Sequence, residues 1–145
     1  MCVFLRFALG LFYLFSGTQK LIEPFPNFLH VVQSYELLHP VGEKITALVV
    51  PWVEFFLGLF LVLGLWLKFA LRTGLTLSLV FMFVVGQAIK RKLPITECGC
   101  FGEFLTLPLE AVFWLDFSFS LLFVLCLRRL PKTSQWSLDQ LYDRK

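Results

Sequence analysis

Charged residues are scarce in this sequence, and their scarcity limits the classes of protein to which it can belong. Of its 145 residues, 16% are charged and 58% are hydrophobic, and the mean hydropathy is +0.79. A soluble domain typically has about 25% charged and about 45–50% apolar residues. Because the charges also cluster between long uncharged stretches, the sequence excludes an ordinary soluble domain and predicts an integral membrane protein that contacts the lipid bilayer.

Residue types that bind metals or nucleic acids are also few. There are two histidines, His30 and His39, and four cysteines. The net charge of +3 arises from Lys and Arg that flank apolar runs, as juxtamembrane basic residues do. We therefore expect no nucleic-acid partner, and we assign no metal ligands.

Four apolar stretches are long enough to cross a bilayer, which requires about 20 mostly apolar residues. They cover residues 2–22, 45–67, about 69–89 and about 108–127. Since backbone groups in lipid must be bonded internally, runs of this length predict helices. The expected fold is an all-α, polytopic membrane four-helix bundle over residues 1–130, with a cytoplasmic interfacial tail at 131–145. Arg6 interrupts the first stretch, which we expect to be a retained span and not a signal peptide.

The connection at residues 23–44 contains a predicted short helix that starts from an N-cap at Asn27 and runs through Leu38. Its apolar residues fall at helical spacing on one face, and its polar residues fall mostly elsewhere. This pattern favours an amphipathic helix at the membrane interface, although a helix packed on the bundle fits the same spacing. The apolar set is Phe28, Val31, Val32 and Tyr35, and the polar set is His30, Gln33 and Glu36.

The distribution of Lys and Arg predicts which side of the membrane each connection occupies. With four crossings, both termini and the second connection share one side, which carries eight basic residues against five on the other. Because cytoplasmic segments are enriched in Lys and Arg, we expect cytoplasmic termini and an extracytoplasmic third connection in a bacterial inner membrane. The eight are Arg6, Lys68, Arg72, Arg128, Arg129, Lys132, Arg144 and Lys145, and the five are Lys20, Lys44, Lys90, Arg91 and Lys92.

That third connection contains two cysteines, Cys98 and Cys100, separated by Gly99. A disulfide between them closes a very small ring, and strained disulfides are easily reduced and tend to be catalytic or regulatory. Lys90, Arg91 and Lys92 would favour a thiolate if the loop folds back. Two thiolates at this spacing also suit Cu(I) or Zn(II), and a loop without chemistry fits as well. The spacing alone leaves these alternatives open.

Three ionisable residues lie within the predicted spans, where a charge costs several kcal/mol and requires a partner or a function. Arg6 is near the cytoplasmic end of the first span, and Glu54 and Asp116 lie at similar depth in the second and fourth. In one interpretation Arg6 extends to the cytoplasmic interface, while the two acids bond to other helices through Gln87 or serines. In the other interpretation, the three residues form a quinone or proton site.

Two lysines and two glycines complete the sequence predictions. Lys20 and Lys44 are expected to be anchors at the outer interface. Gly58 and Gly64 are expected to permit close helix contacts.

The sequence around the cysteines, Cys98-Gly99-Cys100-Phe101-Gly102, resembles the signature loop of the MauE family, a DoxX-like group of four-helix membrane proteins. The resemblance extends over most of residues 1–127. The first stretch is similar to the family pattern R…G…F…G..KL, with Arg6, Gly10, Phe12, Gly17 and Lys20-Leu21. Pro51-Trp52-Val53-Glu54 resembles the P-W-x-E motif, Tyr35-Glu36-Leu37-Leu38-His39-Pro40 is similar to Y-x-L-L-P with His39 inserted, and Asp116 falls where the family often has Asp or Asn.

The resemblance implies a redox-associated membrane protein. The family's namesake is linked to maturation of methylamine dehydrogenase, whose small subunit needs disulfides, and relatives often work beside thioredoxin-like partners. In layout the family resembles DsbB and vitamin K epoxide reductase, which pass thiol electrons to quinones. Those enzymes use two cysteine pairs, whereas one pair, Cys98 and Cys100, is expected to face outward here, which argues against a two-pair relay.

Two functions follow as hypotheses. In the first, the chain is a thiol–disulfide oxidoreductase in which Cys98 and Cys100 exchange electrons with a thioredoxin-like extracytoplasmic protein, with a quinone as cofactor. In the second, it is a structural or assembly subunit of a larger membrane complex, and the cysteine pair is a local staple or a metal clip.

Overall fold

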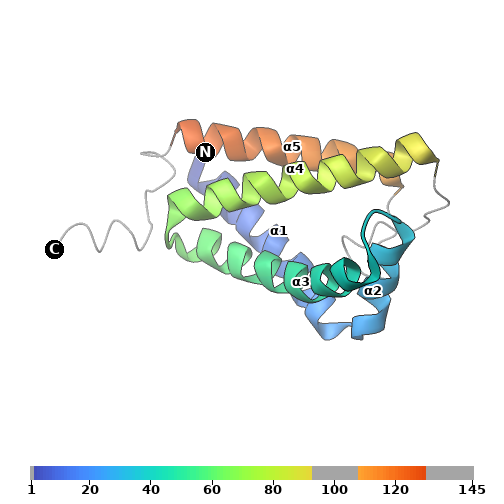
Figure 1. Cartoon of the computed structure of the whole chain (residues 1–145). Helices are drawn as coiled ribbons and strands as arrows, with labels where there is room; N and C mark the ends of the chain where they lie inside the picture. Colours follow the sequence, from blue (N-terminus) through green and yellow to red (C-terminus); the bar gives the residue numbers. More distant parts are fainter. Residues whose placement is uncertain (1, 93–107, 130–145) are drawn as a thin grey trace.

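The computed structural model describes residues 2–92 and 108–129, and every secondary-structure element in that part of the chain is an α-helix. The helices are α1 (Cys2–Ile22), α2 (Phe25–Ser34), α3 (Pro40–Leu63), α4 (Leu67–Arg91) and α5 (Leu109–Arg128). Four are long, and the short α2 lies at one end of the bundle (Figure 1). The predicted all-α bundle with a short helix after the first span is thereby confirmed.

Among the described helices, α3, α4 and α5 each have the length and composition of a membrane span. They contain 24, 25 and 20 residues, and an 18-residue stretch of each has a mean hydropathy of 2.2, 1.8 and 1.9, respectively. Helix α1 has a comparable length of 21 residues but contains Arg6 and Lys20. The protein is therefore a multi-pass membrane protein.

The long helices form two closely packed antiparallel pairs, α1 with α3 and α4 with α5. In the first pair, a Cβ on Gly17 would lie 2.5 Å from the backbone nitrogen of Phe55. A Cβ on Gly58 would overlap the backbone of Leu14. Such close contacts are possible only because Gly17 and Gly58 have no Cβ, so the expected role of Gly58 is confirmed.

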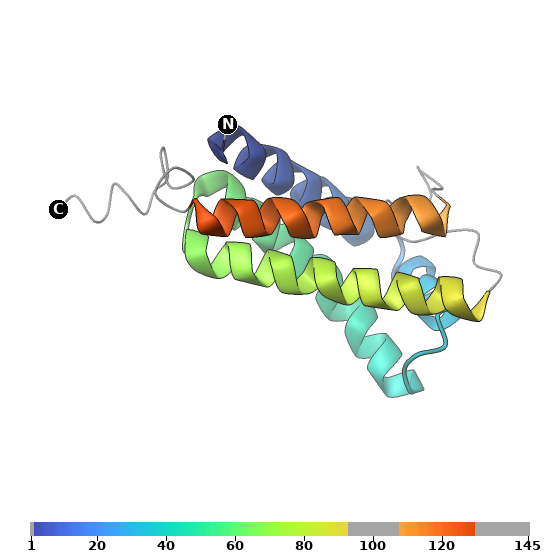
Figure 2. The same ribbon diagram turned by 90° about the horizontal axis from the view of Figure 1, so that it is seen from above.

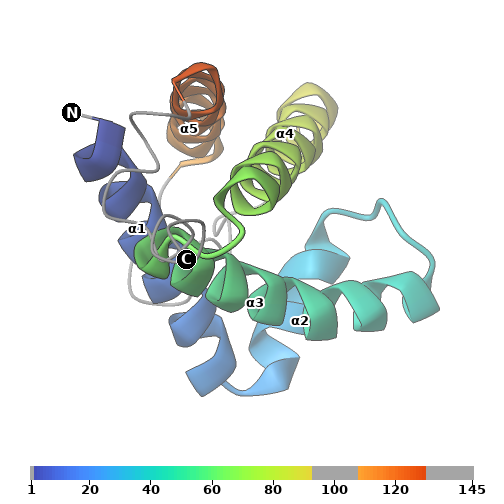
Figure 3. The same cartoon turned by 90° about the vertical axis from the view of Figure 1, so that its left-hand side faces the viewer.

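The bundle is tight at one end and open at the other. Near the termini, buried residues of α1, α3, α4 and α5 share one core that includes Leu9, Leu61, Leu71 and Phe123. From the turn that joins them, α3 and α4 then diverge (Figures 2 and 3). At the open end, called the α2 end below, Tyr35 joins a second core with residues of α4 and α5. Helix α2 lies at this end (Figure 1) and contacts α3.

Several predicted helix boundaries differ from the observed ones. Helix α2 begins at Phe25 with Pro24 as its N-cap, so the predicted cap at Asn27 is wrong, and it ends at Ser34 rather than Leu38. Proline is compatible with a first turn because N–H groups there have no intrahelical partner. Helix α3 likewise begins at Pro40, five residues before the predicted start.

Gly64 has a different role from the one expected. It is the C-cap of α3 in the left-handed region, with φ of 69°, and its N–H donates to the carbonyl of Phe60. A residue with a Cβ is strained in this conformation. Gly64 therefore ends a helix rather than permitting a close contact between helices.

Two predicted regions lie outside the described residues. They are the loop with Cys98 and Cys100, which connects α4 to α5, and the tail at residues 131–145.

Candidate functional site

A buried ion pair connects α1 and α3. The Lys20 ammonium nitrogen lies 2.7 Å from Glu54 Oε1 and 2.6 Å from Oε2. The side chains of Lys20 and Glu54 are 2% and 1% exposed. The pair is therefore shielded from solvent by protein, where a single unpaired charge would be strongly unfavourable.

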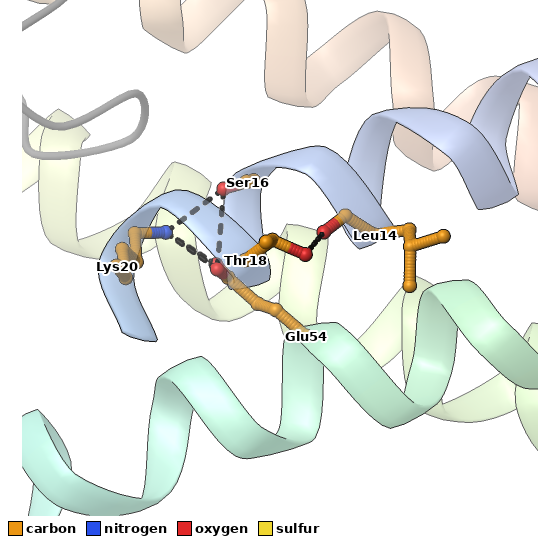
Figure 4. A network of polar contacts seen from close by, with 5 residues as sticks. All are labelled: Leu14, Ser16, Thr18, Lys20 and Glu54. Atoms are coloured by element: carbon orange, nitrogen blue, oxygen red, sulfur yellow. Dashed lines mark hydrogen bonds and ion pairs between the residues drawn. The ribbon is translucent and has the colours of Figure 1, made fainter. Parts of the chain in front are cut away.

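Ser16 completes this network (Figure 4). Its hydroxyl accepts a hydrogen bond from the Lys20 ammonium at 3.0 Å and donates one to Glu54 Oε2 at 3.2 Å. Ser16 and Lys20 lie four residues apart and so share one face of α1. Gly17, between them, allows α3 to approach closely enough for Glu54 to reach both.

Two aromatic rings lie beside the ammonium group. Lys20 Nζ is 5.3 Å from the ring centroid of Phe28 on α2 and 5.8 Å from that of Phe81 on α4. Cations are attracted to the faces of aromatic rings at such distances. Residues from α1, α2, α3 and α4 therefore meet at Lys20.

A cavity of about 470 Å³ adjoins this cluster at the α2 end, and we call it the α2 cavity. Among the described residues that line it, Lys20 is the one charged residue and nearly all the others are apolar. The predicted apolar face of α2 forms one wall, while His30, Gln33 and Glu36 are exposed. The apolar face of α2 thus turns toward the bundle, and the location of α2 at the membrane interface stays a prediction.

Arg91, at the end of α4, bonds to the two residues that directly follow α2. Its guanidinium donates to the backbone carbonyls of Tyr35 and Glu36, both at 3.3 Å, and forms an ion pair with the Glu36 carboxylate at 3.4 Å. Tyr35 lines the α2 cavity. The connection that contains the two cysteines leaves α4 directly after this contact, at Lys92.

The three residues of the predicted quinone or proton site occupy three different helix contacts. Glu54 joins α3 to α1. Arg6 on α1 is fully buried, lies over the ring of Phe7 and is near Cys126 on α5. The backbone carbonyl of Asp116 on α5 accepts a hydrogen bond from Ser78 on α4 at 2.9 Å. The interpretation that Arg6 extends to the interface is wrong.

The interpretation that Glu54 bonds to another helix through a serine is confirmed by Ser16, whereas sequence reasoning missed Lys20 as its ion-pair partner. Lys20 was expected to be an interfacial anchor, whereas it is 5% exposed and paired inside the bundle. The four-residue spacing of Ser16 and Lys20, together with a buried acid in the next span, was the available signal. Lys44 is exposed, and its anchoring role stays a prediction.

A comparison with protein families decides the wider relationship. The model of the family described as methylamine utilisation protein MauE matches residues 1–129. The chain belongs to the MauE family. The match includes the whole described bundle and the loop with Cys98 and Cys100, so the family resemblance found in the motifs is confirmed.

No curated protein and no solved structure matches the chain. Within the described residues, no group of three or more His, Cys, Asp or Glu is arranged to hold a metal ion. The Lys20–Glu54–Ser16 network and the adjoining α2 cavity are therefore the chemically distinctive features of the part of this MauE-family bundle that the structure describes.

Proposed function

We propose that this MauE-family protein is a membrane thiol–disulfide redox protein that uses Cys98 and Cys100. The observation that carries the proposal is the Cys98-Gly99-Cys100 pair within the region matched by the family model, in the connection between two long helices of a membrane bundle. The short spacing favours an easily reduced disulfide. The predicted topology places this connection on the extracytoplasmic side, where disulfides persist.

The proposed exchange occurs with a thioredoxin-like protein outside the membrane. A partner thiolate attacks one sulfur of the Cys98–Cys100 disulfide, which forms a mixed disulfide and releases the other cysteine. The second partner thiol then attacks the partner's own sulfur in the mixed disulfide and releases the remaining cysteine of this chain. The partner gains a disulfide, and Cys98 and Cys100 become thiols, so two electrons and two protons pass to this chain. The reverse sequence reduces the partner. The family description suggests that the exchange contributes to methylamine utilisation.

A membrane quinone supplies a two-electron acceptor when it is bound, and it would return Cys98 and Cys100 to the disulfide. The residues predicted for a quinone or proton site were Arg6, Glu54 and Asp116. Of these, Glu54 is supported by a neighbouring feature, because its ion-pair partner Lys20 lines the α2 cavity.

The first test is a redox titration of Cys98 and Cys100 in purified protein, read by differential alkylation and mass spectrometry. We expect a reversible two-electron couple that responds to a quinone analogue. Cysteines that stay oxidised, stay reduced or hold a metal at every potential would contradict the proposal. They would favour an assembly subunit of a larger membrane complex.

The second test is substitution of the cysteines. We expect Cys98→Ser and Cys100→Ser each to abolish the two-electron oxidation or reduction of the partner, because a single thiol can form a mixed disulfide but cannot close a disulfide within the loop. Cys126→Ala is the control, since Cys126 is a buried cysteine near the C-terminal end of α5. Two-electron oxidation or reduction of the partner that persists in both serine variants would refute the assignment.

A further inference from the structure

The α2 cavity has the size and lining of a ligand site. Small-molecule sites in proteins measure about 300–1,000 Å³ and are mostly apolar with a few placed polar groups. The α2 cavity measures about 470 Å³, and residues from α1, α2, α3 and α4 line it. Its walls include the aromatic side chains of Phe28, Tyr35 and Phe81. An occupant must therefore be largely apolar, and flat rings have aromatic surfaces to contact.

Lys20 gives the cavity a charged hydrogen-bond donor, beside the hydroxyls of Tyr35 and Thr46 among the described residues that line it. An ammonium group has three N–H donors and accepts nothing, so it selects a ligand with an acceptor oxygen. Lys20 bonds to Glu54 and to Ser16, and Ser16 also donates to Glu54. A ligand oxygen can thus replace Ser16 as an acceptor while Ser16 keeps its own bond to Glu54.

The charge on Lys20 is balanced, which matters for the kind of ligand. Glu54 lies within 2.7 Å of the ammonium, so the pair is neutral overall, and a fully ionised ligand would bring an unbalanced charge into an apolar cavity. A neutral carbonyl oxygen avoids that penalty. It still receives a charge-assisted hydrogen bond, which is stronger than a bond between two neutral groups.

We propose that the α2 cavity binds a neutral, membrane-soluble molecule whose carbonyl oxygen accepts a hydrogen bond from Lys20. This assignment rests on the proposed function, within which the molecule is a quinone. The dithiol of Cys98 and Cys100 would lose two electrons and two protons, and the quinone would gain both to become a hydroquinone. Arg91 links the cavity wall at Tyr35 to the end of α4, from which the cysteine connection departs.

A matched pair of variants tests the site without disturbing the ion pair. Val50 lines the α2 cavity, whereas the adjacent Val49 lines a separate apolar groove between α3 and α4. Val50→Phe fills the cavity, and Val49→Phe adds the same volume outside it. The probe is an azidoquinone photolabel in quinone-free nanodiscs, and the labelled peptides are identified by mass spectrometry.

We expect labelling of peptides from α2 and α4 that decylubiquinone displaces. Val50→Phe should weaken the apparent affinity about tenfold, and Val49→Phe should leave it unchanged. The double variant Lys20→Gln/Glu54→Gln keeps two polar side chains that bond to each other but removes the ammonium, so it should also bind about tenfold more weakly. The assignment of the α2 cavity as the binding site is overturned if Val50→Phe leaves the labelling unchanged. It is also overturned if the labelled residues lie in the groove at Val49.

Two further measurements separate this inference from the proposed function. Binding is repeated in Cys98→Ser/Cys100→Ser, where it should persist, since none of the described residues that line the cavity is a cysteine. Dodecanoic acid is the competing lipid probe, and displacement of the photolabel at or below the decylubiquinone concentration would overturn the carbonyl-ligand assignment. If Val50→Phe leaves both the labelling and the thiol exchange with the soluble partner unchanged, quinone binding in the α2 cavity is refuted. The proposed function would then remain intact.

Discussion

Lys20 and Glu54 place a full positive and a full negative charge together inside an apolar bundle. Removing each charge from water costs several kcal/mol, which their mutual attraction offsets only when geometry and further hydrogen bonds are favourable. Here both carboxylate oxygens lie within 2.7 Å of the ammonium, and Ser16 adds two hydrogen bonds. The pair therefore stabilises the α1–α3 contact only as a complete unit.

At the residue scale, we predict that replacing one member of the ion pair lowers stability far more than replacing both members. Lys20→Met leaves a buried, unpaired carboxylate and should lower the free energy of unfolding by about 3–5 kcal/mol. Lys20→Met/Glu54→Leu should recover most of that loss, because no charge then remains. Unfolding by SDS titration in mixed micelles, followed by tryptophan fluorescence, measures the difference.

Lys44→Met is the control for this series, since Lys44 is exposed and should change stability little. A double variant as unstable as Lys20→Met would show that the two side chains stabilise the bundle through packing rather than through charge pairing.

At the element scale, α1 and α3 approach each other through glycines. A Cβ at Gly58 would overlap the backbone of Leu14, and one at Gly17 would overlap the backbone of Phe55. Backbone atoms cannot rotate away as a side chain does, so the two helices must separate to admit even one methyl group. The close approach is also what brings Glu54 within reach of Lys20.

We predict that Gly58→Ala destabilises the bundle by at least about 1–3 kcal/mol and loosens the ion pair. Gly42→Ala is the matched control in the same helix, because its nearest neighbour atom would lie 3.6 Å from the new Cβ. That change should be neutral or stabilising by about 0.5–1 kcal/mol, since alanine favours helix. Thermal unfolding of both variants in detergent decides between these outcomes, and equal melting temperatures would contradict the prediction.

At the scale of the whole molecule, the bundle has two unlike ends. The N-terminus of α1, the α3–α4 turn and the C-terminus of α5 lie together at the tight end (Figure 1). Helix α2, the α2 cavity and the end of α4 lie at the other. This arrangement matches the predicted pairing of connections, while the orientation in the membrane rests on the distribution of Lys and Arg.

We predict that the α2 end faces the extracytoplasmic side. A membrane-impermeant maleimide should label reduced Cys98 and Cys100 in intact cells. A cysteine introduced at Leu65, in the α3–α4 turn, should react only after permeabilisation. Cys98→Ser/Cys100→Ser provides the background for the second reporter. Labelling of the Leu65 reporter in intact cells, without labelling of the native pair, would reverse the topology.

The sequence predicted the long helices well but not the partners of the buried charges. Long apolar runs and prolines largely define where spans lie, because few other structures satisfy the backbone in lipid. Helix ends were predicted less well, since α2 begins at Phe25 after its N-cap Pro24 and α3 begins at Pro40, whereas the expected starts were Asn27 and Ile45. The pairing of Glu54 was missed because it depends on how α1 crosses α3, which no local pattern specifies.

By itself, the sequence determined that this is an all-α, multi-pass membrane protein with the motifs of the MauE family, because composition and spacing are properties of the chain alone. Only the tertiary structure decided that Lys20 is a buried partner of Glu54 and that Arg6 is covered within the bundle. It also decided that the apolar face of α2 lines a cavity. These features depend on glycine-permitted helix crossings and on the divergence of α3 from α4, which bring together residues far apart in the chain.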